Sequence, residues 1–209
     1  MRDLLILGTG VHGGEMAEIV ERVNAVTPTW NLLGFISSDG SRVGELHNGL
    51  PILGGREKLA DYPQASLVPD NQWPRNTDVP KARLISLVDP SAFVSRTAIL
   101  GAGCVIYPQC YIGLNARLGD YVFSLSGSII NHDDVIGDRT VLASGVRLAG
   151  CVQVEEDCYL GQACTIRQYL RIGHGSLIGM GAVVVKDVPP QSVMVGNPAR
   201  VLVKKAESQ

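Results

Sequence analysis

The sequence predicts two domains in series, a small α/β domain followed by a parallel β-helix. Two observations predict this fold class. Residues 4–37 have the pattern of a strand, a glycine turn, a helix and a second strand. From Val88 to Val184, every sixth residue is aliphatic, with one exception. The expected divisions are a nucleotide- or sugar-binding domain at 1–85, a β-helix at 86–188 and a C-terminal tail at 189–209.

The six-residue period predicts the β-helix. An α-helix repeats every 3.6 residues and an ordinary strand every two, so neither produces a period of six. A short strand followed by a corner does, and three such hexads close one triangular coil. The exception to the aliphatic pattern is Ser124.

A second, small side chain lies two residues before most aliphatic positions, and it also faces inward because side chains alternate along a strand. Four of the five cysteines occupy such positions: Cys104, Cys110, Cys158 and Cys164. Cysteines that share a face are three coils apart, roughly 14 Å at the spacing of neighbouring strands, which is too far for a disulfide. The sequence therefore predicts buried free thiols.

The first domain begins with a short βαβ unit. The strand LLILG (4–8) leads into GTGVHGG, in which Gly8, Gly10 and Gly13 match G-x-G-x-x-G. Such a turn places backbone N–H groups against a phosphate at a helix N-terminus. The domain is too short for a complete dinucleotide fold, so a mononucleotide fits better.

Two polar residues near this unit are candidate acceptor contacts. His12 lies in the glycine turn, where it could contact a phosphate or a sugar, or cap the helix. Asp39 follows the second strand (31–37), where it could bind a base or ribose. Residues 51–55 and the Pro-rich stretch 68–81 have the composition of turns and linkers.

Composition excludes several classes of function. The net charge is −2 and no basic run occurs before the last residues, so nucleic acid is an unexpected partner. No uncharged apolar run is long enough to span a membrane. The N-terminus lacks the features of a signal peptide, and the odd number of cysteines includes no CxxC pair, so the expected location is the cytoplasm.

A polar cluster, Asn131-His132-Asp133-Asp134, lies in the middle of the repeat, and the six-residue step continues through it from Ile130 to Ile136. His132 is two residues after Ile130, so it falls at a corner and its side chain points away from the core. A histidine there is suited to act as a general base, or it is simply solvated. Asp133 is placed to orient the imidazole. Asp134 falls at an inward position, where a carboxylate must be paired or protonated.

Steps of one coil from His132 predict a column along the β-helix axis. One coil further is Gly150, which has no side chain and permits close approach of a substrate. The same step then reaches Gln168 and Lys186, which could line a groove for a long cofactor.

Several motifs resemble those of bacterial sugar O- and N-acyltransferases, the group of the sialic-acid O-acetyltransferases and bacillosamine-type N-acetyltransferases. They are GTGVHGG, DPSAFVS (89–95), NHD (131–133), IGMGAVVVKDVP (178–189) and VGNPAR (195–200). The resemblance implies a left-handed β-helix, a homotrimer, acetyl-CoA as donor and, often, a nucleotide-linked amino sugar as acceptor. It implies surface polysaccharide or glycan biosynthesis as the setting.

The resemblance also implies residue roles. The Gly150 amide would bind the thioester oxygen, Lys186 or Arg200 would meet coenzyme A phosphates, and no metal would be needed. Two departures from the family pattern are Val141, where relatives often have a second histidine, and Asp134, where they tend to have cysteine.

Other interpretations remain. The acceptor could be a hydroxyl, as in a sialic-acid-type O-acetyltransferase, or the chain could be a non-catalytic sugar-binding β-helix. A zinc enzyme of the γ-carbonic-anhydrase kind needs three histidines, and the repeat supplies only His132 and His174, on different faces. The sequence does not choose between UDP and dTDP, between N- and O-acetylation, or among acceptor sugars.

Overall fold

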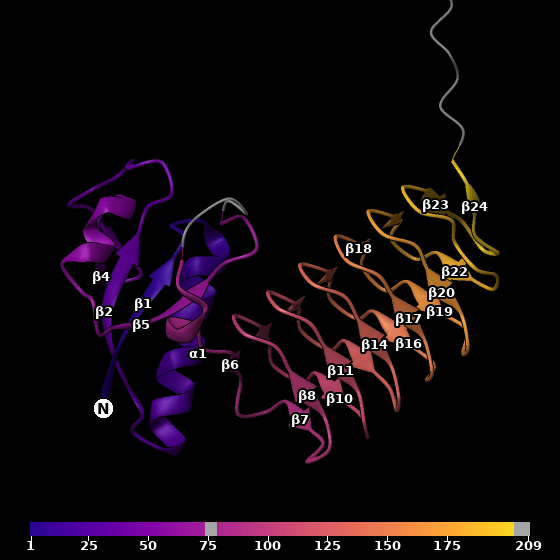
Figure 1. The fold of residues 1–209 in the computed structure, drawn as a ribbon, viewed down its shortest axis with the longest axis horizontal. Helices are drawn as coiled ribbons and strands as arrows, with labels where there is room; N and C mark the ends of the chain where they lie inside the picture. The colour runs from indigo at the N-terminus through magenta and orange to yellow at the C-terminus, as the bar shows by residue number, and fades with distance from the viewer. Residues whose placement is uncertain (74–78, 203–209) are drawn as a thin grey trace, which may run out of the picture.

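The computed structural model describes residues 1–73 and 79–202. An N-terminal α/β domain lies beside a long β-helix whose coils stack along one axis (Figure 1). Within the described residues, no helix is both long and apolar enough to cross a membrane.

The N-terminal domain is built on a five-stranded sheet with the strand order β3-β4-β2-β1-β5. The strands are β1 (Arg2–Leu7), β2 (Trp30–Ile36), β3 (Leu46–His47), β4 (Leu50–Gly54) and β5 (Ser66–Pro69). All pairs are parallel except β3 with β4. The helix α1 (Val11–Val26) connects β1 to β2, and two 3₁₀ helices follow at Arg56–Ala60 and Lys81–Arg83.

The prediction of turns and linkers at 51–55 and 68–81 is wrong in part. Residues 50–54 form β4, and the first residues of the second stretch complete β5. Both strands are short and contain a proline, so their local pattern resembles a turn. Pairing with β2 and β1, which are distant in sequence, makes them strands. Residues 74–78 of the second stretch lie outside the described residues, as does the polar end of the tail, 203–209.

The β-helix has three sheets, which we call faces one, two and three, and their strands are parallel except for the pair of β23 with β24 at the end of face three. Face one contains β7 (Phe93–Val94), β10 (Tyr111–Ile112), β13 (Ile129–Ile130), β16 (Arg147–Leu148), β19 (Thr165–Ile166) and β22 (Val183–Val184). Face two contains β8 (Ile99–Leu100), β11 (Arg117–Leu118), β14 (Val135–Ile136), β17 (Gln153–Val154) and β20 (Arg171–Ile172). Face three contains β6 (Leu87–Val88), β9 (Val105–Ile106), β12 (Phe123–Ser124), β15 (Val141–Leu142), β18 (Tyr159–Leu160), β21 (Leu177–Ile178), β23 (Val193–Val195) and β24 (Arg200–Val201).

The register follows the predicted coil of three hexads. Tyr111 pairs with Ile129, for example, one full coil later. The corners are tight because one residue in each adopts a positive φ, as at Asn115 and Asp133. The aliphatic residues of the repeat fill the interior from Ile106 onward. The predicted fold class, an α/β domain followed by a hexad β-helix, is confirmed.

The two domains share one hydrophobic core. Met16 and Val20 of α1 belong to the same buried cluster as Leu87 and Val105 of the first coils. An ion pair reinforces this junction, because Arg22 donates two hydrogen bonds to Asp89 at 2.6 and 3.0 Å. The N-terminal domain is therefore joined directly to the end of the β-helix.

All five cysteines are free, as predicted for the four inward ones. Burial raises the pKa of the Cys104 and Cys158 thiols to about 11, so these groups stay neutral and act as small apolar side chains.

Candidate functional site

The polar cluster forms a corner between face one and face two. The strand β13 ends at Ile130 and β14 begins at Val135, so four residues make the turn. Ile130 and Ile136 are buried on either side, which keeps the repeat in register through the cluster. Asp133 takes the left-handed conformation with φ of 59°. The His132 side chain points outward and is 51% exposed.

His132 and Asp133 form a hydrogen-bonded pair. The distance from His132 Nδ1 to Asp133 Oδ2 is 2.9 Å. Asn115, one coil earlier, donates from Nδ2 to the other oxygen of Asp133 at 3.0 Å. The hydrogen bonds from His132 and Asn115 hold the pKa of Asp133 below its usual value. An ionised Asp133 favours the proton on Nδ1, which leaves the lone pair of Nε2 available for a base.

Gly150 lies against the other side of the His132 ring. A Cβ added at Gly150 would be 2.8 Å from His132 Nε2, and φ of 95° also disfavours a side chain there. The Gly150 N–H has no hydrogen-bond partner within residues 1–73 and 79–202. A free amide beside a free imidazole nitrogen is an arrangement that can bind a developing oxyanion while a proton is taken.

Asp134 is fully buried and both of its oxygens accept backbone hydrogen bonds. Oδ2 accepts from Asn131 N at 2.6 Å, and Oδ1 accepts from Val152 N at 2.8 Å. Burial raises the pKa of Asp134 to about 6, although the two N–H groups oppose that shift. Because Asn131 precedes His132 and Val152 follows Gly150 by two residues, Asp134 ties together the two turns that hold the candidate site.

The rest of the predicted column lies where the repeat places it. Gln168 and Lys186 are exposed at the corner between face one and face two. Arg200 is elsewhere, on β24 at the end of face three, where it is exposed. The structure therefore brings together His132, Asp133 and Gly150, and leaves Arg200 away from this column.

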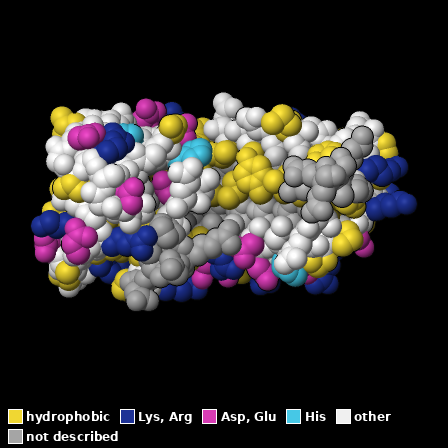
Figure 2. All heavy atoms as spheres, turned by 90° about the horizontal axis from the view of Figure 1, so that it is seen from above, with side chains coloured by type: hydrophobic (Ala, Val, Ile, Leu, Met, Phe, Trp, Pro, Cys, Tyr) yellow, Lys and Arg dark blue, Asp and Glu magenta, His cyan; other side chains and the backbone are white. Residues whose placement is uncertain are grey.

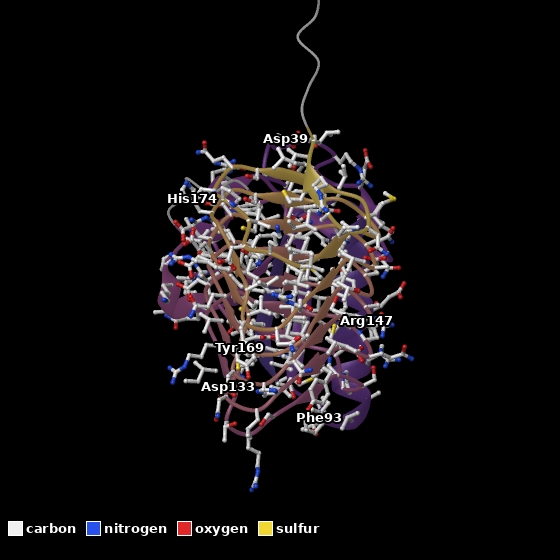
Figure 3. The ribbon with its side chains drawn as sticks, turned by 90° about the vertical axis from the view of Figure 1, so that its right-hand side faces the viewer. Asp39, Phe93, Asp133, Arg147, Tyr169 and His174 are labelled. Atoms are coloured by element: carbon white, nitrogen blue, oxygen red, sulfur yellow. The ribbon has the colours of Figure 1, made fainter. Side chains whose placement is uncertain are left out.

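Three residues near His132 were missed by sequence reasoning. They are Asn115, Cys151 and Tyr169, which share the corner of Asp133 at steps of one coil. Adding and subtracting the coil length from Asp133, as was done from His132, would have found them. Figure 3, viewed along the β-helix, shows Asp133 and Tyr169 at the same corner and His174 at another.

The glycine turn is closely packed. A Cβ at Gly8 would overlap the carboxylate of Asp70, and one at Gly13 would overlap the Gly8 carbonyl oxygen. Burial raises the pKa of Asp70. Packing thus accounts for Gly8 and Gly13. Gly10 is the N-cap of α1 and has no side chain to cap it, so the first N–H groups of the helix stay open to a ligand.

The carbonyl groups of this turn are bound by a neighbouring segment that the sequence did not single out. Arg42 donates to the Thr9 carbonyl at 3.0 Å, and Nε2 of His47 lies 3.1 Å from the Gly10 carbonyl oxygen. These contacts hold the turn in place and occupy the carbonyl oxygens of Thr9 and Gly10.

His12 contacts the β-helix as well as the turn. Its Nδ1 lies 3.0 Å from Glu15 Oε2 and 3.2 Å from the hydroxyl of Tyr107. Its ring also packs edge-on against Phe123 on face three. His12 is therefore part of the domain junction, on a different side of the prism from His132.

Asp39 is exposed but already engaged. It accepts hydrogen bonds from Ser41 N at 2.9 Å and Ser37 Oγ at 2.7 Å. These bonds hold the pKa of Asp39 far below its usual value. Seen along the β-helix axis in Figure 3, Asp39 and Asp133 lie at opposite sides of the molecule. Asp39 and the candidate base of one chain therefore do not meet.

Grooves run along two corners of the β-helix. One, beside the column of Asp133, is lined by Cys151, Gln153, Tyr169, Leu170, Arg171 and Asp187. The other, between face three and face one, is more apolar and includes Leu125, Tyr159, Leu177 and Met180. Figure 2 shows hydrophobic side chains gathered along the middle of the molecule.

Comparison with known sequences gives partial matches. No family model matches the chain. The acyl carrier protein-linked UDP-N-acetylglucosamine O-acyltransferase of Pseudomonas aeruginosa is 39% identical over 82 residues, which cover 39% of this chain and 32% of that protein. The enzyme of the same name from Pseudomonas fluorescens matches to the same extent. The matched part spans about a third of the length of these curated relatives.

Comparison with solved structures gives matches over nearly the whole chain. The acetyltransferase domain of PglB from Neisseria gonorrhoeae, also solved with acetyl coenzyme A, is 27% identical with a TM-score of 0.85, covering 97% of this chain and 100% of that one. A mutant of perosamine N-acetyltransferase from Caulobacter crescentus, in complex with CoA and GDP-perosamine, is 25% identical, with a TM-score of 0.85 and 98% of both chains covered.

WeeI from Acinetobacter baumannii has a TM-score of 0.78 at 25% identity, covering 97% of this chain and 100% of that one. The similarity thus includes the N-terminal domain and the junction as well as the β-helix. Both domains are shared in order with these acetyltransferases, and the six-residue repeat runs through the second domain, so over nearly its whole length the chain has the same two-domain, hexapeptide-repeat architecture as these acetyltransferases.

Proposed function

We propose that this protein transfers the acetyl group of acetyl-CoA to the amino group of a nucleotide-linked amino sugar. The observation that carries the proposal is the arrangement of His132, Asp133 and Gly150 at one corner. Residues 1–85 would bind the acceptor nucleotide, and residues 86–188 would carry out the transfer. The perosamine N-acetyltransferase structure contains CoA with GDP-perosamine, so GDP joins UDP and dTDP as a candidate carrier.

The proposed reaction uses Nε2 of His132 as the general base. The acceptor amine attacks the thioester carbonyl carbon, and Nε2 takes the proton that the amine loses. Asp133 stabilises the resulting imidazolium, and the Gly150 N–H donates to the carbonyl oxygen as it becomes an oxyanion. The tetrahedral intermediate then collapses, the C–S bond breaks, and the His132 imidazolium returns its proton to the sulfur, so that coenzyme A leaves as the thiol.

The proposal includes a homotrimer. In one chain, Asp39 lies on the opposite side of the molecule from Asp133 (Figure 3), and the His12 ring packs against Phe123 on face three. A neighbouring subunit would bring its bound acceptor to this corner. The grooves along the corners would hold the pantetheine arm, with Gln168 beside it and Lys186 or Arg200 near the phosphates.

The first test is thiol release from acetyl-CoA with a panel of UDP-, dTDP- and GDP-linked amino sugars. We expect one acceptor class to react, and His132→Ala to lower kcat by about 10²- to 10⁴-fold while coenzyme A still binds. His174→Ala is the matched control, because His174 is also at a corner beside a carboxylate, Glu155 at 3.6 Å. A His132→Ala enzyme with near wild-type kcat rules out the assigned base.

A second candidate is O-acyl transfer to a sugar hydroxyl. The partial sequence match to UDP-N-acetylglucosamine O-acyltransferases favours it, and the same base and amide serve a hydroxyl nucleophile equally well. Release of thiol with hydroxyl sugars but with none of the amino sugars would favour this candidate.

A further inference from the structure

Cys151 has no part in the proposed proton transfer, but it lines the groove beside the candidate base. A ring nitrogen of His132, a carboxylate oxygen of Asp133 and the Cys151 sulfur all lie within 4.8 Å of one another. The backbone fixes this proximity, because Cys151 N donates to the His132 carbonyl oxygen at 3.0 Å. Cys151 is also the only cysteine of the chain that is not fully buried.

We propose that His132, Asp133 and Cys151 form a binding site for a divalent transition-metal ion, with Zn²⁺ as the best fit. Imidazole, carboxylate and thiolate are the three side-chain ligands that Zn²⁺ takes in proteins. When the thiol gives up its proton, the thiolate and the carboxylate together balance the charge of the ion. Three protein ligands leave a fourth tetrahedral position for water.

The geometry requires only a small closure of the side chains. Zinc ligands lie about 2.0–2.3 Å from the metal, so neighbouring ligand atoms in a tetrahedral site are roughly 3.3–3.7 Å apart. The His132 and Asp133 side chains are 51% and 48% exposed, which leaves them room to rotate.

The surrounding contacts support a metal site. Asn115 already holds the second oxygen of Asp133, and such outer hydrogen bonds orient carboxylate ligands. Asn131 Oδ1 accepts from His132 N at 2.9 Å, and Asp134 fixes the same turn. The backbone under all three ligands is therefore rigid before an ion arrives.

A bound ion would inhibit the proposed enzyme. The ion would coordinate both the His132 imidazole and the Asp133 carboxylate that orients the ring. His132 could then no longer accept a proton from the acceptor. This consequence rests on the proposed function, whereas metal binding itself does not.

The test measures binding of Co²⁺ and Zn²⁺ to the full chain without substrate. Wild-type protein should bind one Co²⁺ per chain and show the near-ultraviolet absorption of a cobalt–thiolate bond. Cys151→Ser should lose that band and bind Zn²⁺ at least about tenfold more weakly. Cys158→Ser is the matched control, because Thr140 and Ser176 hold the same inward position one coil before and after, and it should keep the band.

In the activity assay, Zn²⁺ should inhibit wild-type protein and Cys158→Ser, whereas Cys151→Ser, compared with its own turnover in the absence of metal, should resist inhibition at least about tenfold better. The proposal fails if wild-type protein shows no cobalt–thiolate band, if the band persists in Cys151→Ser, or if Zn²⁺ inhibits both proteins equally. Absence of turnover with every acceptor would count against the proposed function and leave the cobalt measurement intact.

Discussion

Asp134 occupies an inward position of the repeat that is usually held by a small residue, and its carboxylate accepts hydrogen bonds from two backbone N–H groups. The inward hydroxyls of Thr140 and Ser176 each make one such contact to the next coil, with Cys158 N and Ser192 N. The carboxylate makes that contact and also closes its own turn at Asn131. The resulting turn places His132.

We predict that Asp134→Asn lowers both stability and kcat. The amide has one acceptor oxygen, so either Asn131 N or Val152 N loses its partner, at a cost of about 1–3 kcal/mol in the free energy of unfolding. Because the turn then shifts, kcat should fall more than the affinity for acetyl-CoA. Urea unfolding and steady-state kinetics measure the two effects.

Ser176→Ala is the control for Asp134→Asn. It removes an equivalent inward acceptor, that of Ser192 N, in a coil remote from His132. We expect reduced stability with unchanged kcat. Equal kcat in both variants would mean that Asp134 is structural only.

At the residue scale, the sequence predicted which residues lie near each other along the β-helix axis. It also identified the position at which the inward pattern of small side chains breaks. The period alone placed Gly150 beside His132 and identified Asp134 as an inward carboxylate. It did not predict the partners of Asp134, because those are backbone N–H groups, which every residue type carries. The domain junction of His12 with Tyr107 was likewise beyond a local pattern, since it joins two domains.

At the scale of the element, glycine is required in the coils for two different structural reasons. Gly137 has no positive φ, but an added Cβ would overlap the backbone of Glu155 and Glu156 in the next coil. Gly127 has φ of 71° with open space around it. The first is required by stacking and the second by the corner conformation, which Asn115 and Arg139 adopt without being glycine.

We predict that Gly137→Ala is much more destabilising than Gly127→Ala. The corner substitution should cost about 1–2 kcal/mol, the penalty for a left-handed L-residue. The stacking substitution should cost more, because two coils must separate along the axis. Thermal unfolding of both variants measures the difference, and equal shifts in Tm would show that stacking does not restrict Gly137.

The period of six predicted these strands well because their hydrogen bonds follow from a constant step. The N-terminal sheet was predicted less well. β4 and β5 are strands because β2 and β1 pair with them, and such long-range pairing leaves little trace in five residues.

At the scale of the whole molecule, the junction depends on a buried carboxylate. The Asp89 side chain has no exposed surface, whereas its partner Arg22 is half exposed. Burial raises the pKa of Asp89, but the hydrogen bonds from Arg22 and Ser91 outweigh that effect and keep it below its usual value. Asp89 therefore stabilises the native state above its ordinary pKa, and this contribution is lost as the pH falls through the lower, native value.

We predict that Arg22→Ala lowers Tm more at pH 7 than at an acidic pH below the native pKa of Asp89, because protonation of Asp89 removes its attraction to the guanidinium. Lys58→Ala is the control, because Lys58 and Asp61 form an exposed pair, which contributes little. An equal loss of Tm at both pH values would show that the guanidinium acts through packing rather than charge.

The constant coil length also restricts how far the site can lie from the domain junction. Because each strand pairs with the strand one coil later, inserting one whole coil between the junction and Asn131 would move His132 along the axis by about 4.8 Å and keep it at the same corner. Inserting a single hexad would instead turn His132 to a different corner. The position of His132 along the axis can therefore change only by whole coils, because any smaller change in length would move His132 away from its corner.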